Sequence, residues 1–169
     1  GDLSRQVDRN KLKVMDKVWS VDAIAKNQST DIYGNITTLS ESVLDENILY
    51  AGTDDGLIHA TQNGGKDWTM IDVKSGLPEL AYVHQVMASR HDKNTVYAVF
   101  NHHRFGDFRP FVYRSRDGGK TWAAIQQNLP ARGSVYTIAE DHINKDLLFV
   151  GTEFGVFVTI DSGAQWTQL

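Results

Sequence analysis

An eight-residue pattern that occurs three times constrains the fold of this chain more than any other feature. The copies span residues 61–68, 115–122 and 159–166, and the middle one reads Ser-Arg-Asp-Gly-Gly-Lys-Thr-Trp. Asp or Asn at the third position can accept hydrogen bonds from backbone N–H groups two residues on. Gly at the fifth position tolerates the positive φ of a tight hairpin turn. Each octet therefore predicts a turn between two strands, covered by the ring of its final Trp.

The structural positions of these octets are their hydroxyl, amide or carboxyl, Gly and Trp residues. They are Thr61, Asn63, Gly65, Trp68, Ser115, Asp117, Gly119, Thr121, Trp122, Thr159, Asp161, Gly163 and Trp166. An alternative is that the third-position carboxylates are catalytic or bind a metal. Turn chemistry accounts for them more simply, because the same position holds Asn in the first copy.

The spacing of the octets predicts an all-β chain. The three Trp residues are 54 and 44 residues apart, and a four-stranded blade takes about 40–45 residues. Short β-branched and aromatic runs, broken by Gly, Asn and Asp, fill the intervals. We predict three four-stranded antiparallel blades, and we expect the longer interval to hold an inserted loop. The ranges are an irregular connection from a preceding blade at 1–33, blades at 34–73, 82–126 and 134–169, and a loop at 101–110.

The octets resemble the Asp-box, or BNR repeat, of β-propeller proteins. Residues 49–56 and 148–155 share the pattern Leu-aromatic-x-Gly-Thr and each precede an octet. With residues 2–5 and 133–136, they are similar to bacterial sortilin-like and glycosyl-hydrolase-like propellers. The resemblance implies a propeller in a longer protein that is secreted or periplasmic in a bacterium. Because closed propellers have about 4–8 blades, we expect further blades, or a second copy, to complete the ring. The first 30 residues are another candidate cover for one open edge.

Composition excludes several classes of function. The chain of 169 residues has no cysteine, which excludes disulfides and thiolate metal sites. A net charge of −4 offers no basic face for nucleic acid, and no apolar run is long enough to span a membrane. No phosphate-binding Gly loop or Ser–His–Asp arrangement is present. We therefore expect no cofactor and no metal.

Candidate site residues follow from the loops that join the second strand of each blade to the third. In propellers these loops lie at the end opposite the octets, where ligands usually bind. Asp54, Asp55 and Glu153 fall in them and are candidates for the acid and base of a glycoside hydrolase. The alternative is that they were selected for turn chemistry.

The stretch 101–110 has no counterpart in the other two blades. We predict that it forms a ligand-binding face, with Phe154 added from the third blade. The residues of that face are His102, His103, Arg104, Asp107, Arg109 and Phe154. Adjacent His residues on an extended chain point apart and no third His follows at ligand spacing, so this stretch does not predict a metal site.

Three functions remain open. The leading one is a non-catalytic binding or scaffold segment that presents a face to a protein or a glycan. The second is part of a glycoside hydrolase, sialidase- or xyloglucanase-like, whose active site is shared with other blades. Sialidases use three Arg, a Tyr–Glu pair and an Asp, together with an Arg-Ile-Pro motif. The nearest match to that motif here is Phe108-Arg109-Pro110, so the sialidase resemblance is incomplete. The third is an assembly factor.

Overall fold

The computed structural model describes residues 3, 5, 7–8, 10–14, 17–18 and 33–169. A pair of two-residue strands, β1 (Lys13–Val14) and β2 (Lys17–Val18), lies in the N-terminal segment. Residues 19–24, whose sequence could also form a strand, lie outside the described residues.

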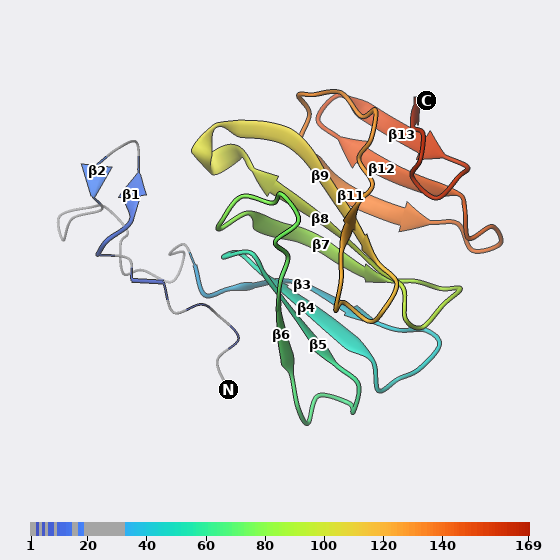
Figure 1. Ribbon diagram of the computed structural model, residues 1–169, viewed down its shortest axis with the longest axis horizontal. Helices are drawn as coiled ribbons and strands as arrows, with labels where there is room; N and C mark the ends of the chain where they lie inside the picture. Colours follow the sequence, from blue (N-terminus) through green and yellow to red (C-terminus); the bar gives the residue numbers. More distant parts are fainter. Residues whose placement is uncertain (1–2, 4, 6, 9, 15–16, 19–32) are drawn as a thin grey trace.

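Three four-stranded antiparallel sheets follow, as the sequence predicts (Figure 1). The first holds β3 (Ile36–Glu41), β4 (Leu49–Thr53), β5 (Leu57–Thr61) and β6 (Thr69–Asp72). The second holds β7 (Tyr82–Ala88), β8 (Val96–His102), β9 (Asp107–Ser115) and β10 (Ala123–Ala124). The third holds β11 (Val135–Glu140), β12 (Leu148–Thr152), β13 (Gly155–Thr159) and β14 (Thr167–Gln168). Within each sheet every strand pairs with the next one along the chain.

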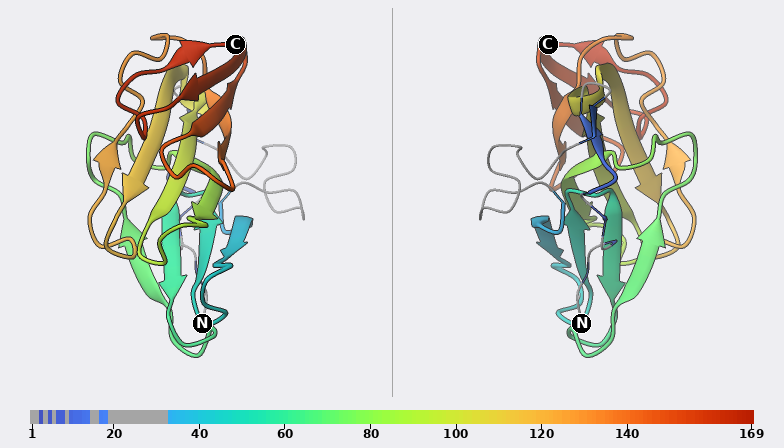
Figure 2. Two further views of the ribbon diagram at one scale, coloured as in Figure 1. Left: turned by 90° about the vertical axis from the view of Figure 1, so that its right-hand side faces the viewer. Right: turned by 90° about the vertical axis from the view of Figure 1, so that its left-hand side faces the viewer.

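The sheets pack face to face in chain order (Figure 2). Alternating side chains of each sheet enter one of two apolar clusters, because successive residues of a strand point to opposite faces. The cluster between the first two sheets includes Tyr50, Ile58, Val83, Phe100, Tyr113 and Trp122. The cluster between the second and third includes Tyr97, Val112, Ile138, Leu148, Phe157 and Trp166. The innermost strands β3, β7 and β11 lie next to one another.

The segment 101–110 differs from the expected loop, because most of it is strand. Residues 101 and 102 complete β8, and residues 107–110 begin β9. Between them a single 3-10 turn, η1 (His103–Phe105), ends at Gly106 with φ +76°. His102 pairs with Asp107 across the hairpin. Extending an existing ladder satisfies the backbone N–H and C=O groups that an irregular loop would leave to solvent.

Arg5 ties the N-terminal segment to the first sheet. Its backbone N–H donates to Oδ2 of Asp55 at 2.6 Å, and its Nε donates to the Asp55 carbonyl oxygen at 3.0 Å. Its guanidinium forms an ion pair with Asp72 at 2.9 Å. His59 is only 4% exposed although it lies on the face turned away from the second sheet. The start of the chain therefore covers part of that face.

Candidate functional site

The octet turns use their polar side chains to hold the backbone. In the middle copy, Oγ of Ser115 accepts the N–H of Gly119 at 2.8 Å, and Oδ1 of Asp117 accepts the N–H of Thr121 at 2.8 Å. Oδ2 of Asp117 also accepts the hydroxyl of Thr121 at 2.6 Å. These hydrogen bonds, the one from the Thr121 hydroxyl above all, lower the pKa of Asp117 to about 2.

The donor to the third position differs from the expectation. The N–H groups that reach Asn63, Asp117 and Asp161 come from four residues on, and at Asp161 also from three residues on, but not from two. The N–H two residues on belongs to the Gly at the fifth position, and in all three turns it donates to the first-position hydroxyl instead. In all three octets the third-position side chain is therefore engaged in hydrogen bonds within its own turn.

The Trp residues of the octets find acceptors in different places. Nε1 of Trp122 donates to the carbonyl oxygen of Gly119 in its own turn at 2.8 Å. Nε1 of Trp166 donates to the carbonyl oxygen of Ile125, in the preceding sheet, at 2.7 Å. The last octet therefore also helps to hold the second and third sheets together.

Asp54 and Asp55, candidates for an acid and base, are buried caps. Asp54 is 3% exposed, and its carboxylate accepts the backbone N–H groups of Tyr33, Gly34 and Asn35 at 2.8–2.9 Å. Asp55 is fully buried and accepts the N–H of Arg5. Neither carboxylate is available to a substrate in this arrangement.

A β-bulge lies at the same place in each innermost strand. The ladder register shifts between Ile36 and Thr38, between Val83 and Gln85, and between Val135 and Thr137. The bulge residues are Thr37, His84 and Tyr136, and none of them has a partner in the ladder. Bulges commonly re-aim side chains next to functional sites.

Two of these bulge residues belong to a continuous chain of contacts across the second and third sheets. The guanidinium of Arg104 lies 5.3 Å from the ring centre of Tyr82, and that ring lies 5.7 Å from His84. His84 meets Tyr136 edge to face at 4.9 Å, and the hydroxyl of Tyr136 donates to Oε1 of Glu153 at 2.9 Å. We call Arg104, Tyr82, His84, Tyr136 and Glu153 the central row.

The central row holds its histidine neutral at neutral pH. Burial lowers the pKa of His84 below its ordinary value of 6.5, and the nearby charge of His103 lowers it further. Tyr136 shows the opposite shift, because burial and its hydrogen bond to Glu153 raise the pKa of its hydroxyl. The row thus runs from the guanidinium group of Arg104 to the carboxyl group of Glu153, with three rings between them.

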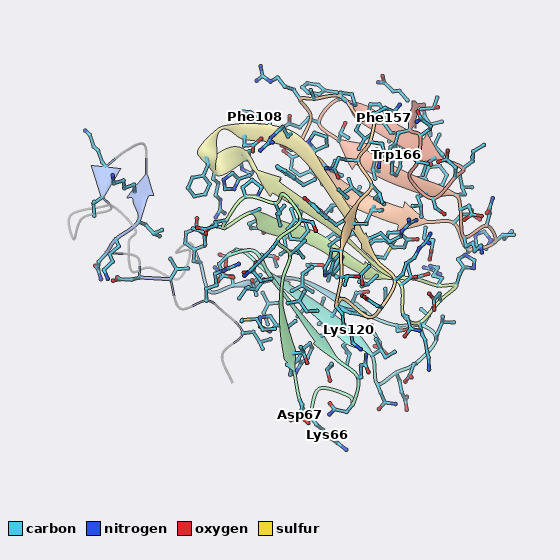
Figure 3. The ribbon with its side chains drawn as sticks, in the orientation of Figure 1. Lys66, Asp67, Phe108, Lys120, Phe157 and Trp166 are labelled. Atoms are coloured by element: carbon cyan, nitrogen blue, oxygen red, sulfur yellow. The ribbon has the colours of Figure 1, made fainter. Side chains whose placement is uncertain are left out.

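The residues predicted for a ligand-binding face are only partly brought together. Arg104 belongs to the central row, and Phe154 is 66% exposed beside Gly133. Asp107 and Arg109 form an ion pair with each other at 2.6 Å. The ring of His102 stacks on Phe105 at 4.4 Å, and His103 begins η1. Figure 3 shows Phe108 near this turn and Lys66 and Asp67 at the far end of the first sheet.

Sequence reasoning missed Tyr82, His84 and Tyr136. The available signal was positional, since His84 and Tyr136 directly follow Val83 and Val135, which occupy equivalent places in β7 and β11. Within the described part of the chain, no three His, Asp or Glu side chains are grouped so as to hold a metal ion. In that same part, no helix is long and apolar enough to cross a membrane.

Solved structures with the same arrangement identify the architecture. A glycoside hydrolase of family GH74 from Niastella koreensis superposes with a TM-score of 0.62 at 14% identity, over 79% of this chain and 22% of that one. The chain folds as blades of a β-propeller. A GH74 xyloglucanase from Xanthomonas campestris gives a TM-score of 0.60 at 15% identity, over 80% and 23% of the two chains.

A third similar propeller is YCF48 bound to D1 peptide, with a TM-score of 0.62 at 19% identity, over 79% of this chain and 39% of that one. The chain thus spans less than half of each of these propellers. No family model matches the sequence, and a search of the curated proteins gives no match. At these identities the likeness establishes the fold alone.

Proposed function

We propose that this chain is a non-catalytic propeller segment that binds a protein partner through the central row and the adjoining surface of η1 and Phe154. The central row carries the proposal, because its aromatic and cationic side chains line up across two blades at the ends opposite the octets. Tyr and Arg are enriched in protein interfaces, where they dominate the binding energy. Phe105 and Phe154, 48% and 66% exposed, add apolar surface beside the row.

The state of the carboxylates supports binding over hydrolysis. A glycosidase pair needs two accessible carboxyl groups about 5–10 Å apart. Asp54 and Asp55 are buried caps, and Asp107 is neutralised by Arg109. Glu153 is exposed and bonded to Tyr136. YCF48, which has a similar fold, was solved with a peptide bound, and this supports a role in binding or assembly for the present chain as well.

A selected peptide tests this proposal. Peptides chosen from a random display library on the wild-type chain should bind about tenfold or more weakly to Tyr82→Ala and Arg104→Gln. Lys66→Ala, at the far end of the first sheet, is the matched control and should leave binding unchanged. Peptides that bind all four proteins equally would contradict the proposal.

One observation favours the hydrolase alternative. The hydrogen bond between Tyr136 and Glu153 is a Tyr–Glu pair, the combination that sialidases use as nucleophile and base. Under that alternative, a fluorogenic sialoside would be cleaved by the wild-type chain and not by Tyr136→Phe or Glu153→Gln. We expect no cleavage by any of the three, because Asp54, Asp55 and Asp107 are engaged by backbone N–H groups or by Arg109 and are not free to act as the acid.

A further inference from the structure

A cavity opens at the octet end of the molecule, away from the central row. It measures about 360 Å³ and lies between the second and third sheets. Arg114 and Arg116 reach it from β9 and the octet that follows, and Lys145 reaches it from the β11–β12 hairpin. Glu140 and Tyr97, both buried, lie among its lining residues.

Among the described residues, the three cations of this cavity have no ionic partner. Within the described part of the chain, no carboxylate oxygen lies within 4.0 Å of a side-chain nitrogen of Arg114, Arg116 or Lys145. The half-buried guanidinium of Arg114 makes one hydrogen bond, from Nη1 to the carbonyl oxygen of Ser162 at 2.8 Å. Its remaining N–H donors are left for another acceptor.

The carboxylates in the cavity wall are already engaged. Both oxygens of Glu140 accept the hydroxyl of Ser89, and they also accept the backbone N–H of Arg90 at 2.6 Å and the hydroxyl of Tyr97 at 3.1 Å. Asp146 accepts the hydroxyl of Ser162 at 2.6 Å.

The remaining acidic residue of the wall, Asp92, accepts the hydroxyl of Thr95 at 2.7 Å and the N–H of Asn94 at 3.1 Å. All three carboxylates thus accept hydrogen bonds from other groups of the protein, and none forms an ion pair with the three cations.

The fold does not need these cations. Arg114 immediately precedes an octet, and the same place is held by Ala60 in the first blade and Val158 in the third. Arg116, the second residue of its octet, is matched by Gln62 and Ile160. Two blades therefore form equivalent turns with uncharged residues.

The backbone beside Arg114 is strained. Ser162, whose carbonyl oxygen accepts the Arg114 guanidinium, has a φ of +58°, while the other two octets place Gly64 and Gly118 there. A non-glycine residue in this conformation is uncommon, and such strain is concentrated at functional sites.

We propose that this cavity binds a phosphate or sulfate group, either free or as a monoester on a larger ligand, through Arg114, Arg116 and Lys145. The planar guanidinium fork matches two oxygens of such a group, and lysine adds a point charge. Burial and the charge of Arg116 both lower the pKa of Arg114, and a bound anion would offset both effects. The site is independent of the central row.

A titration followed by NMR tests this site. Inorganic phosphate, and sulfate separately, are added at an ionic strength held constant with chloride, while the Nε–H signals of the arginines are observed. We expect saturable shifts for Arg114 and Arg116, and affinity about tenfold weaker in Arg116→Gln and Lys145→Gln. Both substituted side chains are exposed, so these variants should fold. Arg104→Gln, in the central row, is the control and should bind as the wild type does.

The same titration with glycerol 3-phosphate separates the two sources of the anion. Tighter binding of the ester assigns the site to a group on a larger ligand, and equal or weaker binding assigns it to the free anion. Shifts that do not saturate, that chloride reproduces, or that persist unchanged in Arg116→Gln and Lys145→Gln would overturn the proposal.

Discussion

The interface between the first two blades and the interface between the second and third are closed in different ways. At the first, hydroxyls of β3 accept backbone N–H groups of β7, from Val86 to Thr38 at 3.2 Å and from Ala88 to Ser40 at 3.0 Å. At the second, the amide of Gln85 spans the gap to β11. A buried carboxylate network around Glu140 extends the second interface toward the octets.

This difference shows that the distinctive polar groups of the chain are concentrated at the second interface. The first interface is apolar and is tied by short hydroxyl groups, which is sufficient to stack two sheets. The second contains the buried side chain of Glu140 and the cavity proposed to bind a phosphate or sulfate group. The contact between His84 and Tyr136 in the central row also crosses this interface. One repeated architecture therefore provides a generic interface and an interface at which both proposed binding sites lie.

The largest effect should come from removing the carboxylate of the second interface. Glu140→Ala leaves the Ser89 hydroxyl, the Arg90 N–H and the Tyr97 hydroxyl without their acceptor, which costs about 3 kcal/mol of the free energy of unfolding. Urea denaturation measures it. Glu153→Ala, an exposed carboxylate of the same blade, is the control and should cost below about 0.5 kcal/mol. Equal losses would show that the network does not hold the blades together.

A methyl group at Gly52 should damage the first interface. A Cβ there would overlap the side chain of Val83 in the next blade and lie 2.6 Å from Cγ2 of Thr38. Gly52→Ala should lower the free energy of unfolding by about 2 kcal/mol. Gly151 is the equivalent residue of the third blade, and its Cβ would meet only Thr137 of its own sheet. Gly151→Ala should therefore cost less, and a reversed order in thermal melts would contradict this account of the interface.

Truncating one polar side chain at each interface between blades compares the hydrogen bonds of the two interfaces directly. Gln85→Ala removes the acceptor of the Ile138 N–H and of the Thr137 hydroxyl, and the donor to the Ile138 carbonyl, at a cost of about 1–2 kcal/mol. Ser40→Ala removes one acceptor, for Ala88, at about 1 kcal/mol. Differential scanning calorimetry on both variants would refute the ranking if Ser40→Ala were the less stable.

The smallest effect is a dependence of stability on pH. Burial lowers the pKa values of His59 and His84 from 6.5, so below that pH the unfolded chain binds more protons than the folded one. The free energy of unfolding should be flat above about pH 6.5 and should fall as the pH drops below it. His59→Phe, which copies Phe157 of the third blade, should reduce the slope. An unchanged slope would show that His59 does not contribute.

The fold was predictable because its determinants are local. Each octet fixes its own turn with side chains that accept backbone N–H groups four residues on, and alternation then sets the faces of the strands. The hairpin at 101–110 was expected as a loop, because its His, Arg and Gly residues do not show the pairing of His102 with Asp107.

The site was less predictable because it depends on distant partners. The Asp54 carboxylate accepts its backbone N–H groups only when residues 33–35, about 20 positions earlier in the chain, fold onto it. The contact between His84 and Tyr136 requires two blades to be in place. Nothing in the spacing of the octets reports a β-bulge, and the matching positions of His84 and Tyr136 after Val83 and Val135 do not by themselves mark them as bulge residues.

Those bulges place one unpaired strand residue at the same position in each of the three blades. Residues 37, 84 and 136 stand outside the ladder, one to each blade, so replacing their side chains leaves every strand register intact. At His84 and Tyr136 these side chains lie outside the two apolar clusters. Single substitutions at His84 and Tyr136 should therefore change the proposed binding surface while leaving the two apolar clusters unchanged.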